Sequence, residues 1–208
     1  PQRNRIVPLL MHGDAALAGQ GVVYESLQMS KLPGFENGGT LHIVINNQIG
    51  FTTSPKEGRS TAYCTDIAHT FSAPVLHVNA EDPETCIRAA FMAVELRQRF
   101  HCDVFIDFNC YRKYGHNEGD EPAFTQPLEY DDIRKRKSIR KQYLDGLLSD
   151  GAMDMPKADE IDESYRRQLL EAFTTTQRAQ KVGEKAACQE ERLPTELPVT
   201  GVSLAVLK

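Results

Sequence analysis

Residues 41–47, with the sequence LHIVINN, decide the fold that this chain predicts. Leu41 to Ile45 form a short apolar run that is rich in β-branched residues. The turn-forming sequence Asn37-Gly38-Gly39 precedes the run, and the polar pair Asn46-Asn47 ends it. A short continuous apolar run between turn signals is typical of a strand that is buried on both faces, as in a parallel sheet.

Three other segments resemble this one. Short apolar runs predict strands at residues 5–11, 75–78 and 104–108, the first of which reads as buried. Helix-compatible segments lie between them, at residues 15–31 and 82–99. Asp82 is a good N-cap for the second helix, with Pro83 at the first helical position. Within it, Ile87, Phe91 and Val94 recur at helical spacing and predict an apolar face.

This alternation of strands and helices predicts an α/β fold, with a parallel sheet and helices on both of its faces. In such sheets, ligands bind outside the carboxyl ends of the strands. The residues of interest therefore follow each predicted strand, at 12–14, 46–48, 79–82 and 109–116. The last group opens a long polar loop that runs to residue 126.

Beyond residue 128 the sequence is highly charged and helix-compatible. We expect an α/β domain over residues 1–150 and a helical extension with a linker over residues 151–208, in which residues 181–198 resemble the linker. The chain begins at Pro1 without an initiator Met, and we expect a piece of a longer protein, leading toward a second domain.

Composition excludes several classes of protein. The net charge is −5, which disfavours a nucleic-acid binder. No apolar stretch is long enough to span a membrane. The five cysteines include no C-x-x-C pair, which disfavours a disulfide framework or a zinc site. Reduced thiols fit a bacterial cytoplasm or a mitochondrial matrix, and we expect one of these locations.

Asp14 follows the first predicted strand, and Asn47 follows the second after a gap of thirty residues between Ala15 and Asn46. Parallel strands would bring both ends to one edge of the sheet, where a carboxylate and an amide oxygen are suitable ligands for Mg²⁺. Gly13 and the small Ala15 would allow the backbone to approach phosphate groups closely. Either motif alone is more often a turn or a helix cap, but the pair at this spacing favours a metal site.

The same residues carry a resemblance to a known family. Gly13-Asp14-Ala15 followed by Asn46-Asn47 is similar to the thiamine-diphosphate fingerprint of the transketolase and 2-oxoacid dehydrogenase superfamily. Ala15 replaces the usual last Gly, a departure that is typical of one subfamily. The stretches HGDAALAGQGVVYESLQMS, HIVINNQIGFTT and CYRKYGHNEGDEP resemble that subfamily, the E1 components of 2-oxoglutarate dehydrogenase complexes. The resemblance runs from about residue 6 to at least residue 143.

The resemblance implies that thiamine diphosphate and Mg²⁺ are cofactors. Asp14 and Asn47 would bind the metal through their side chains and Ile49 through its backbone carbonyl. Gly13 and Ala15 would lie beside the diphosphate. His116, in the loop after the fourth strand, would contact the diphosphate or assist lipoyl acylation. From the residues alone, a solvated loop histidine is the favoured interpretation of His116, and only the resemblance makes a role in the site equally plausible.

The implied reaction is decarboxylation of 2-oxoglutarate with transfer of the succinyl group to a lipoyl group on the E2 component, a step of the tricarboxylic acid cycle. A homodimer is implied as well. We find no counterpart of the Glu that activates the cofactor's aminopyrimidine ring, nor of the substrate-binding histidines, so we expect the isolated chain to be inactive. The alternatives are a 2-oxoadipate dehydrogenase and a non-catalytic fragment that acts as a binding or assembly module.

Other candidate residues have simpler interpretations. Gly19-Gln20-Gly21 lacks the third Gly of a dinucleotide-binding motif, so we do not expect NAD binding. His12 is expected to be a packed strand-end residue, and His42 and His69 are expected to be structural. The cationic run at residues 134–141 is expected to be a solvated helix face.

Overall fold

The computed structural model describes residues 3–182 and residue 205. The chain divides into two compact units, with the sequence boundary between Ser149 and Asp150. The first unit contains the sheet and all of the predicted site residues, and the second contains the long helix α8.

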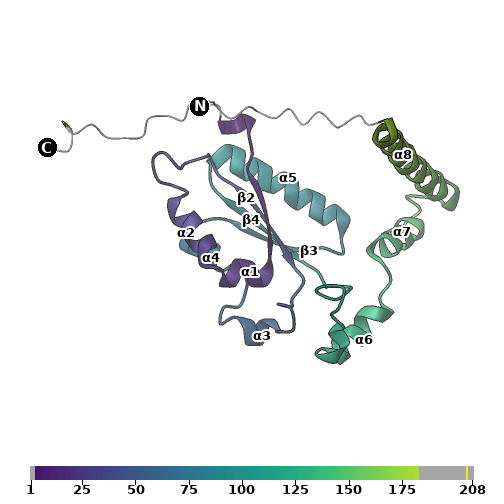
Figure 1. Cartoon of the computed structure of the whole chain (residues 1–208), viewed down its shortest axis with the longest axis horizontal. Helices are drawn as coiled ribbons and strands as arrows, with labels where there is room; N and C mark the ends of the chain where they lie inside the picture. The colour runs from purple at the N-terminus through teal and green to yellow at the C-terminus, as the bar shows by residue number, and fades with distance from the viewer. Residues whose placement is uncertain (1–2, 183–204, 206–208) are drawn as a thin grey trace. The chain divides into compact units, whose positions relative to one another are not determined.

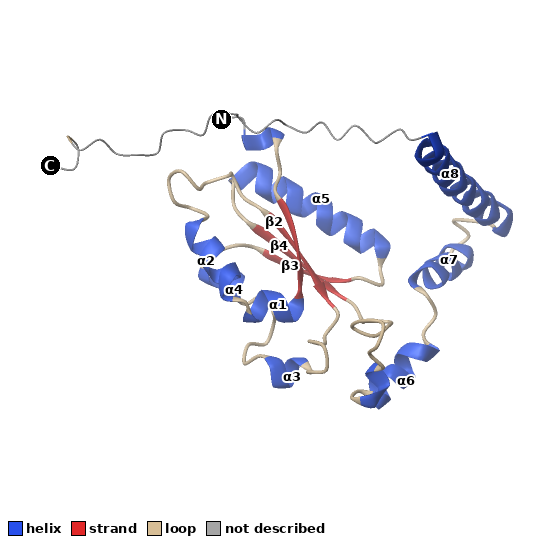
Figure 2. Cartoon of the chain, in the orientation of Figure 1, coloured by secondary structure: helices blue, strands red, loops and turns tan. Residues whose placement is uncertain are grey.

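A four-stranded sheet forms the centre of the first unit (Figure 2). Its strands are β1 Leu9–Gly13, β2 Leu41–Asn46, β3 Val75–Asn79 and β4 Val104–Asn109. They are hydrogen-bonded in the order β1-β2-β4-β3, and every pair is parallel. All four carboxyl ends therefore meet at one edge of the sheet, as the sequence predicted.

Helices cover both faces of this sheet (Figure 1), which confirms the α/β fold. The helices are α1 Asp14–Gly19, α2 Gly21–Met29 and α4 Ile67–Thr70 on one face, and α5 Pro83–Phe100 on the other. On the first face Leu17 and Leu27 pack against Val44 and Phe105. On the second, Ala89 and Ala93 pack against Val104 and Ile106. The alternation of side chains along β4 thus supplies both halves of the core.

The predicted helix over residues 15–31 is in fact two helices. The chain breaks at Gln20, whose φ of −97° and ψ of 121° are extended. Gly19 and Gly21 flank this residue, and glycine is among the poorest helix formers, so a break here costs little. The break lets Leu17 and Leu27 both reach the core although they lie on separate helices.

The first strand is not buried, contrary to the prediction from its composition. It lies at the edge of the sheet, and Leu9, Leu10 and Met11 are 52%, 47% and 67% exposed. An apolar run predicts that a segment forms a strand, but the run alone does not indicate whether another element covers that strand.

The apolar face predicted for α5 is also exposed. Ile87 and Phe91 are 57% and 73% exposed, whereas Ala89 and Ala93 face the sheet. Small alanines allow the helix axis to approach the strands closely. The face with Ala89 and Ala93, and not the face with Ile87 and Phe91, therefore packs on the sheet.

Arg97 fixes the start of the chain to α5. Its side chain is fully buried, and its guanidinium donates to the backbone carbonyls of Arg3, Ile6, Asn37 and Gly39 at 2.9–3.2 Å. A buried guanidinium with five donors is tolerable only when acceptors surround it, and here carbonyl oxygens do so. This one side chain therefore ties together the segment before β1, the turn before β2 and the end of α5.

The remaining elements of the first unit are η1 Arg3–Arg5, α3 Pro55–Gly58, η2 Pro122–Phe124, α6 Pro127–Lys135 and α7 Ile139–Ser149. The cationic run at residues 134–141 begins at the end of α6 and continues into α7, and all of its side chains are exposed, as expected. In the second unit, α8 spans Met155–Val182. Apart from its first two residues, the predicted linker lies outside the described residues.

Two histidines and a phenylalanine stack across three strands. His12 Nε2 lies 3.0 Å from His42 Nδ1, and the His42 ring lies parallel to that of Phe105 with 4.2 Å between centroids. His42 is only 5% exposed. Burial lowers the pKa of His42 to about 4, with Asp103 acting in the opposite direction and His12 in the same one. Burial also lowers the pKa of His12. His42 is therefore a buried neutral ring at neutral pH, and His12 is a half-buried ring stacked against it.

This geometry predicts acid sensitivity. A folded pKa of about 4 lies below the unfolded value of 6.5, so the folded chain binds fewer protons between these values. His42 therefore contributes its full stability above pH 6.5 and loses it as the pH falls toward 4. We expect the free energy of unfolding in urea to fall less between pH 7 and pH 4 in His42→Gln than in wild type. The difference should reach up to about 3 kcal/mol. His69→Gln is the control, because the His69 side chain is 70% exposed. An equal acid loss in wild type and His42→Gln would contradict the prediction.

Candidate functional site

The ends of β1 and β2 converge, as predicted from the spacing of their motifs. Gly13 pairs with Ile45 in the parallel register, and Asp14 begins α1 directly afterwards. A methyl group built on Gly50 would lie 3.0 Å from the Cβ of Ala15. The loop after β2 therefore lies against the first turn of α1, and glycine at residue 50 permits this close approach.

The two asparagines at the end of β2 have different environments. Asn46 is buried, and its Nδ2 donates to Asp107 Oδ1 at 3.0 Å while its Oδ1 accepts from the backbone N–H of Gln48. Asn47 is half-buried, and its Oδ1 accepts from the backbone N–H of Ile49 at 3.3 Å. Gln48 between them has a φ of 62°. The turn thus uses Asn46 as its anchor and leaves a lone pair of Asn47 Oδ1 for another partner.

Asp107 is the buried charge behind this turn, and sequence reasoning did not identify it. It lies in the middle of β4 and is 0% exposed. Besides Asn46, it accepts a hydrogen bond from His77 Nδ1 at 2.8 Å, and Cys64 Sγ lies 3.9 Å away. Burial, and then the charge of Asp107, raise the pKa of Cys64 to about 12, so this thiol is protonated at neutral pH.

Asp14 is a buried carboxylate with one nearby cation. It is 3% exposed, and Arg59 Nη1 lies 3.7 Å from its Oδ2, which is too far for a good hydrogen bond. Burial raises the pKa of Asp14, the charge of Asp107 adds to this effect, and backbone N–H groups and Arg59 oppose it. The carboxylate would therefore gain from a cation closer than Arg59.

The donor set at this edge suits a hard cation that shares its shell with phosphate. Asp14 offers a carboxylate, Asn47 an amide oxygen and Ile49 a backbone carbonyl, and oxygen ligands of these kinds are those that Mg²⁺ takes. A methyl group built on Gly13 would meet no atom within 4 Å, so the strand end borders open space. Within the described residues no three His, Cys, Asp or Glu side chains gather to hold a metal by themselves. A metal held here by Asp14, Asn47 and Ile49 would complete its shell with oxygens from a bound group or from water.

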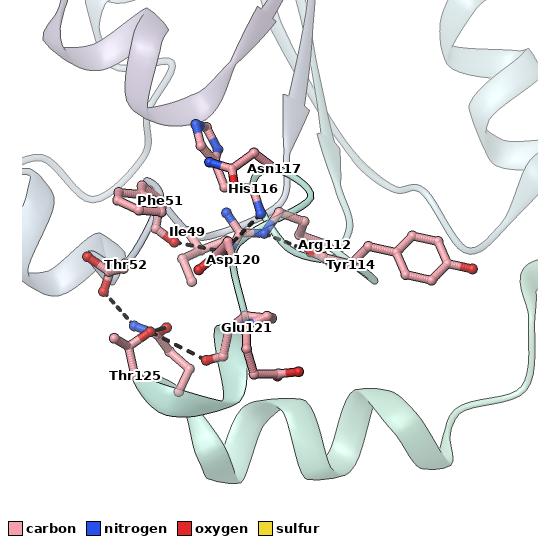
Figure 3. Close-up of polar contacts among 12 residues, drawn as sticks. Ile49, Phe51, Thr52, Arg112, Tyr114, His116, Asn117, Asp120, Glu121 and Thr125 are labelled. Atoms are coloured by element: carbon pink, nitrogen blue, oxygen red, sulfur yellow. Dashed lines mark hydrogen bonds and ion pairs between the residues drawn. The ribbon is translucent and has the colours of Figure 1, made fainter.

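The loop after β4 docks on the loop after β2 through Arg112 (Figure 3). The Arg112 guanidinium donates to the Phe51 carbonyl at 3.0 Å, to the Tyr114 carbonyl at 3.1 Å and to the Tyr130 hydroxyl at 3.2 Å. Asp120 lies 3.6 Å from it as a counter-ion. One planar side chain thus connects both loops with α6.

His116 is exposed and lies at the tip of this docked loop. Its ring lies 5.0 Å from that of Phe51, centroid to centroid, and its backbone N–H donates to Asp120 at 2.8 Å. A methyl group on Gly115 would lie 2.1 Å from the Asp120 carbonyl oxygen, so only glycine fits this tight return of the chain. The structure therefore brings His116 against the same loop that carries Asn47 and Ile49.

The sequence predicted no individual role for three residues at or behind this edge: Arg59, Asp107 and Arg112. A charged residue in a strand or polar loop carries no periodic signal, and its burial depends on segments far away in the sequence. Arg112 had the best available signal, because it lies within the group 109–116 that follows the fourth strand.

The fold and the site together define a class of protein. It is an α/β domain in which oxygen ligands suited to a metal-bound phosphate group lie at the carboxyl ends of parallel strands. Comparison with known proteins gives the family. Residues 2–185 match the family model described as "Dehydrogenase E1 component", and the chain belongs to this family.

The chain is also similar to proteins named "Multifunctional 2-oxoglutarate metabolism enzyme". It is 48% identical over 181 residues to the one from Mycolicibacterium vanbaalenii, covering 87% of this chain and 15% of that protein. It is 47% identical over 176 residues to those from Mycobacterium sp. strains JLS and KMS, covering 85% of this chain and 14% of each. The chain thus spans about one seventh of the length of these relatives. None of the helices described in residues 3–182 is both long and apolar enough to cross a membrane.

The Arg112 contacts predict the behaviour of the docked loop. Replacing Arg112 by Lys keeps the positive charge but removes the planar group that reaches three acceptors at once. We expect hydrogen exchange at residues 112–120 and 51–53 to quicken about tenfold or more in the full-length protein, which corresponds to about 1.4 kcal/mol of local stability.

Arg134→Lys is the matched control, because Arg134 is 60% exposed and pairs with Glu121. We expect it to leave exchange at both loops unchanged. If Arg112→Lys and Arg134→Lys give the same exchange pattern as wild type, Arg112 does not hold the loops together.

Proposed function

We propose that this chain forms the diphosphate- and metal-binding half of the active site of a thiamine-diphosphate-dependent 2-oxoglutarate dehydrogenase. The observation that carries the proposal is the convergence of Asp14, at the start of α1, with the loop that carries Asn47 and Ile49. Membership of the E1 family supports thiamine diphosphate as the cofactor and a 2-oxoacid as the substrate class.

In this proposal, Asp14 and Asn47 bind Mg²⁺ through their side chains, and Ile49 binds it through its carbonyl oxygen. Gly13 and Ala15 lie beside the diphosphate, where a small side chain leaves room for phosphate oxygens. When bound, thiamine diphosphate supplies the electron-accepting ring that makes loss of CO₂ from a 2-oxoacid possible. The residues of this chain hold and orient the cofactor at its diphosphate end.

His116 handles the later step in this proposal. Its ring lies beside Phe51, on the loop that follows the metal-binding turn, and its exposed position leaves it accessible to an incoming group. An imidazole can donate or accept a proton near neutral pH, as transfer of an acyl group to a thiol-containing arm requires. We therefore assign His116 to succinyl transfer to the lipoyl group of an E2 component.

The substrate is proposed as 2-oxoglutarate and not 2-oxoadipate, because 2-oxoglutarate appears in the names of the relatives. A homodimer, and a location in a bacterial cytoplasm or a mitochondrial matrix, complete the proposal. Decarboxylation of labelled 2-oxoglutarate by the full-length protein, compared with 2-oxoadipate, tests the substrate. Equal or faster turnover of 2-oxoadipate would favour 2-oxoadipate as the substrate. Absence of turnover with both acids would favour the alternative function, a binding or assembly module.

Loss of the Asp14 carboxylate should abolish cofactor binding. Asp14 is the only charged group in the proposed metal shell, so Asp14→Ala in the full-length protein should weaken binding of thiamine diphosphate with Mg²⁺ at least a hundredfold. Isothermal titration calorimetry measures this, with circular dichroism to show that the fold survives. Asp131→Ala, an exposed Asp that pairs with Lys135, is the control. Wild-type affinity in the Asp14→Ala protein would refute the metal site.

The role of His116 is separable from decarboxylation. We expect His116→Ala to reduce overall complex activity about tenfold or more, while decarboxylation measured with an artificial electron acceptor falls much less. His69→Ala serves as the control, because the His69 side chain is 70% exposed on α4. Equal losses of the two activities in His116→Ala would remove the proposed role in acyl transfer.

A further inference from the structure

Arg59 is a largely buried arginine whose guanidinium makes few close hydrogen bonds. It follows α3, and its side chain is 14% exposed. Its Nη2 reaches the Ala62 carbonyl only at 3.5 Å, and its Nη1 lies 3.7 Å from Asp14. Its Nε is fully buried and has no hydrogen-bond partner among the described residues.

Other buried arginines in this unit show how unusual this is. Arg97 donates to four backbone carbonyls within 3.2 Å, and Arg112 has three acceptors within the same distance. A buried donor without a partner costs about 1–3 kcal/mol, and more when it is charged. An unpaired buried group of this kind indicates a partner that binds there.

The surroundings of Arg59 identify the chemistry of that partner. It lines a cavity of about 240 Å³ together with Asp14, Ala15, Gly50, Ser54 and Gly58. Asp14 is the only carboxylate in this lining, and small residues make up most of the rest. Space, a planar cation and small neighbours are features of an anion site, and a guanidinium matches phosphate oxygens with two parallel hydrogen bonds.

We propose that Arg59 is a diphosphate-binding residue that changes partner when the cofactor arrives. Before binding, Arg59 is the counter-ion of Asp14. Mg²⁺ then takes over the Asp14 carboxylate, and Arg59 hydrogen-bonds to a diphosphate oxygen. This inference rests on the proposed function, because it uses the same metal and the same cofactor.

The proposal predicts that Arg59 affects the affinities for a free metal ion and for a diphosphate in opposite directions. A cation beside Asp14 opposes the binding of a free divalent metal but favours a diphosphate. Removing the charge with Arg59→Gln should therefore leave the affinity for Mn²⁺ alone equal to or a few fold tighter than wild type. The same change should weaken binding of inorganic pyrophosphate in the presence of Mg²⁺ about tenfold or more, since it removes a charge-assisted hydrogen bond.

The experiment uses the full-length protein with two probes. Electron paramagnetic resonance measures free Mn²⁺ at increasing protein concentration, and calorimetry measures pyrophosphate with Mg²⁺. Arg59→Lys keeps the charge and loses the planar group, so its pyrophosphate affinity should lie between those of wild type and Arg59→Gln. Arg88→Gln is the matched control, because Arg88 is 72% exposed and pairs with Glu84 on the surface of α5.

Each outcome decides the inference. Unchanged pyrophosphate affinity in Arg59→Gln overturns it. Parallel loss of Mn²⁺ and pyrophosphate binding also overturns it, because Arg59 would then only maintain the metal site. If pyrophosphate binding depends on Arg59 but the wild-type protein does not bind thiamine diphosphate, the anion site stands and the proposed function fails. If Arg59→Gln unfolds, the comparison of Arg59→Lys with wild type decides, and equal pyrophosphate affinity in those two overturns the inference.

Discussion

The polar end of this sheet depends on one buried charge, the carboxylate of Asp107. Burying a carboxylate is unfavourable unless its oxygens are hydrogen-bonded, and neighbouring strands on both sides supply the donors, Asn46 from β2 and His77 from β3. These bonds hold the three strand ends in register and fix Asn46 in the core. Because Asn46 in turn accepts from the backbone of Gln48, the position of the loop after β2 follows from a charge in the middle of β4.

This charge also affects the neighbouring group at the edge. Asp107 and Asp14 both carry buried carboxylates, and the charge of Asp107 raises the pKa of Asp14, so that ionisation of Asp14 is less favourable. The single cation near Asp14, Arg59, lies beyond good hydrogen-bonding distance. The buried carboxylates of Asp14 and Asp107 are therefore not fully neutralised by a cation in direct contact. A divalent ion would relieve this imbalance, and the anion that accompanies the ion would give Arg59 a partner in return.

Much of this arrangement could be predicted from local patterns. The four strands follow from apolar runs, and the meeting of Asp14 with the 46–49 turn follows from parallel pairing. Burial could not be predicted in the same way. The runs in β1 and on the outer face of α5 have core-like composition but lie exposed, whereas the charged residue Arg97 of α5 is fully buried. Periodicity identifies an apolar face, but the neighbours that cover a face are set by tertiary packing. The individual roles of Arg59, Arg112 and Asp107 could not be predicted for the same reason.

The pair Asn46-Asn47 shows why two adjacent asparagines are needed at this strand end. Side chains alternate along a strand, so Asn46 points to the same face as Val44 and can reach Asp107. Gln48 takes a positive φ, and the chain leaves the sheet, so Asn47 is not carried into the core. The amide of Asn46 therefore anchors the turn. That turn positions the amide of Asn47, whose oxygen keeps a lone pair for another ligand. A single asparagine could not do both, because an amide that is buried against Asp107 cannot also face the open edge.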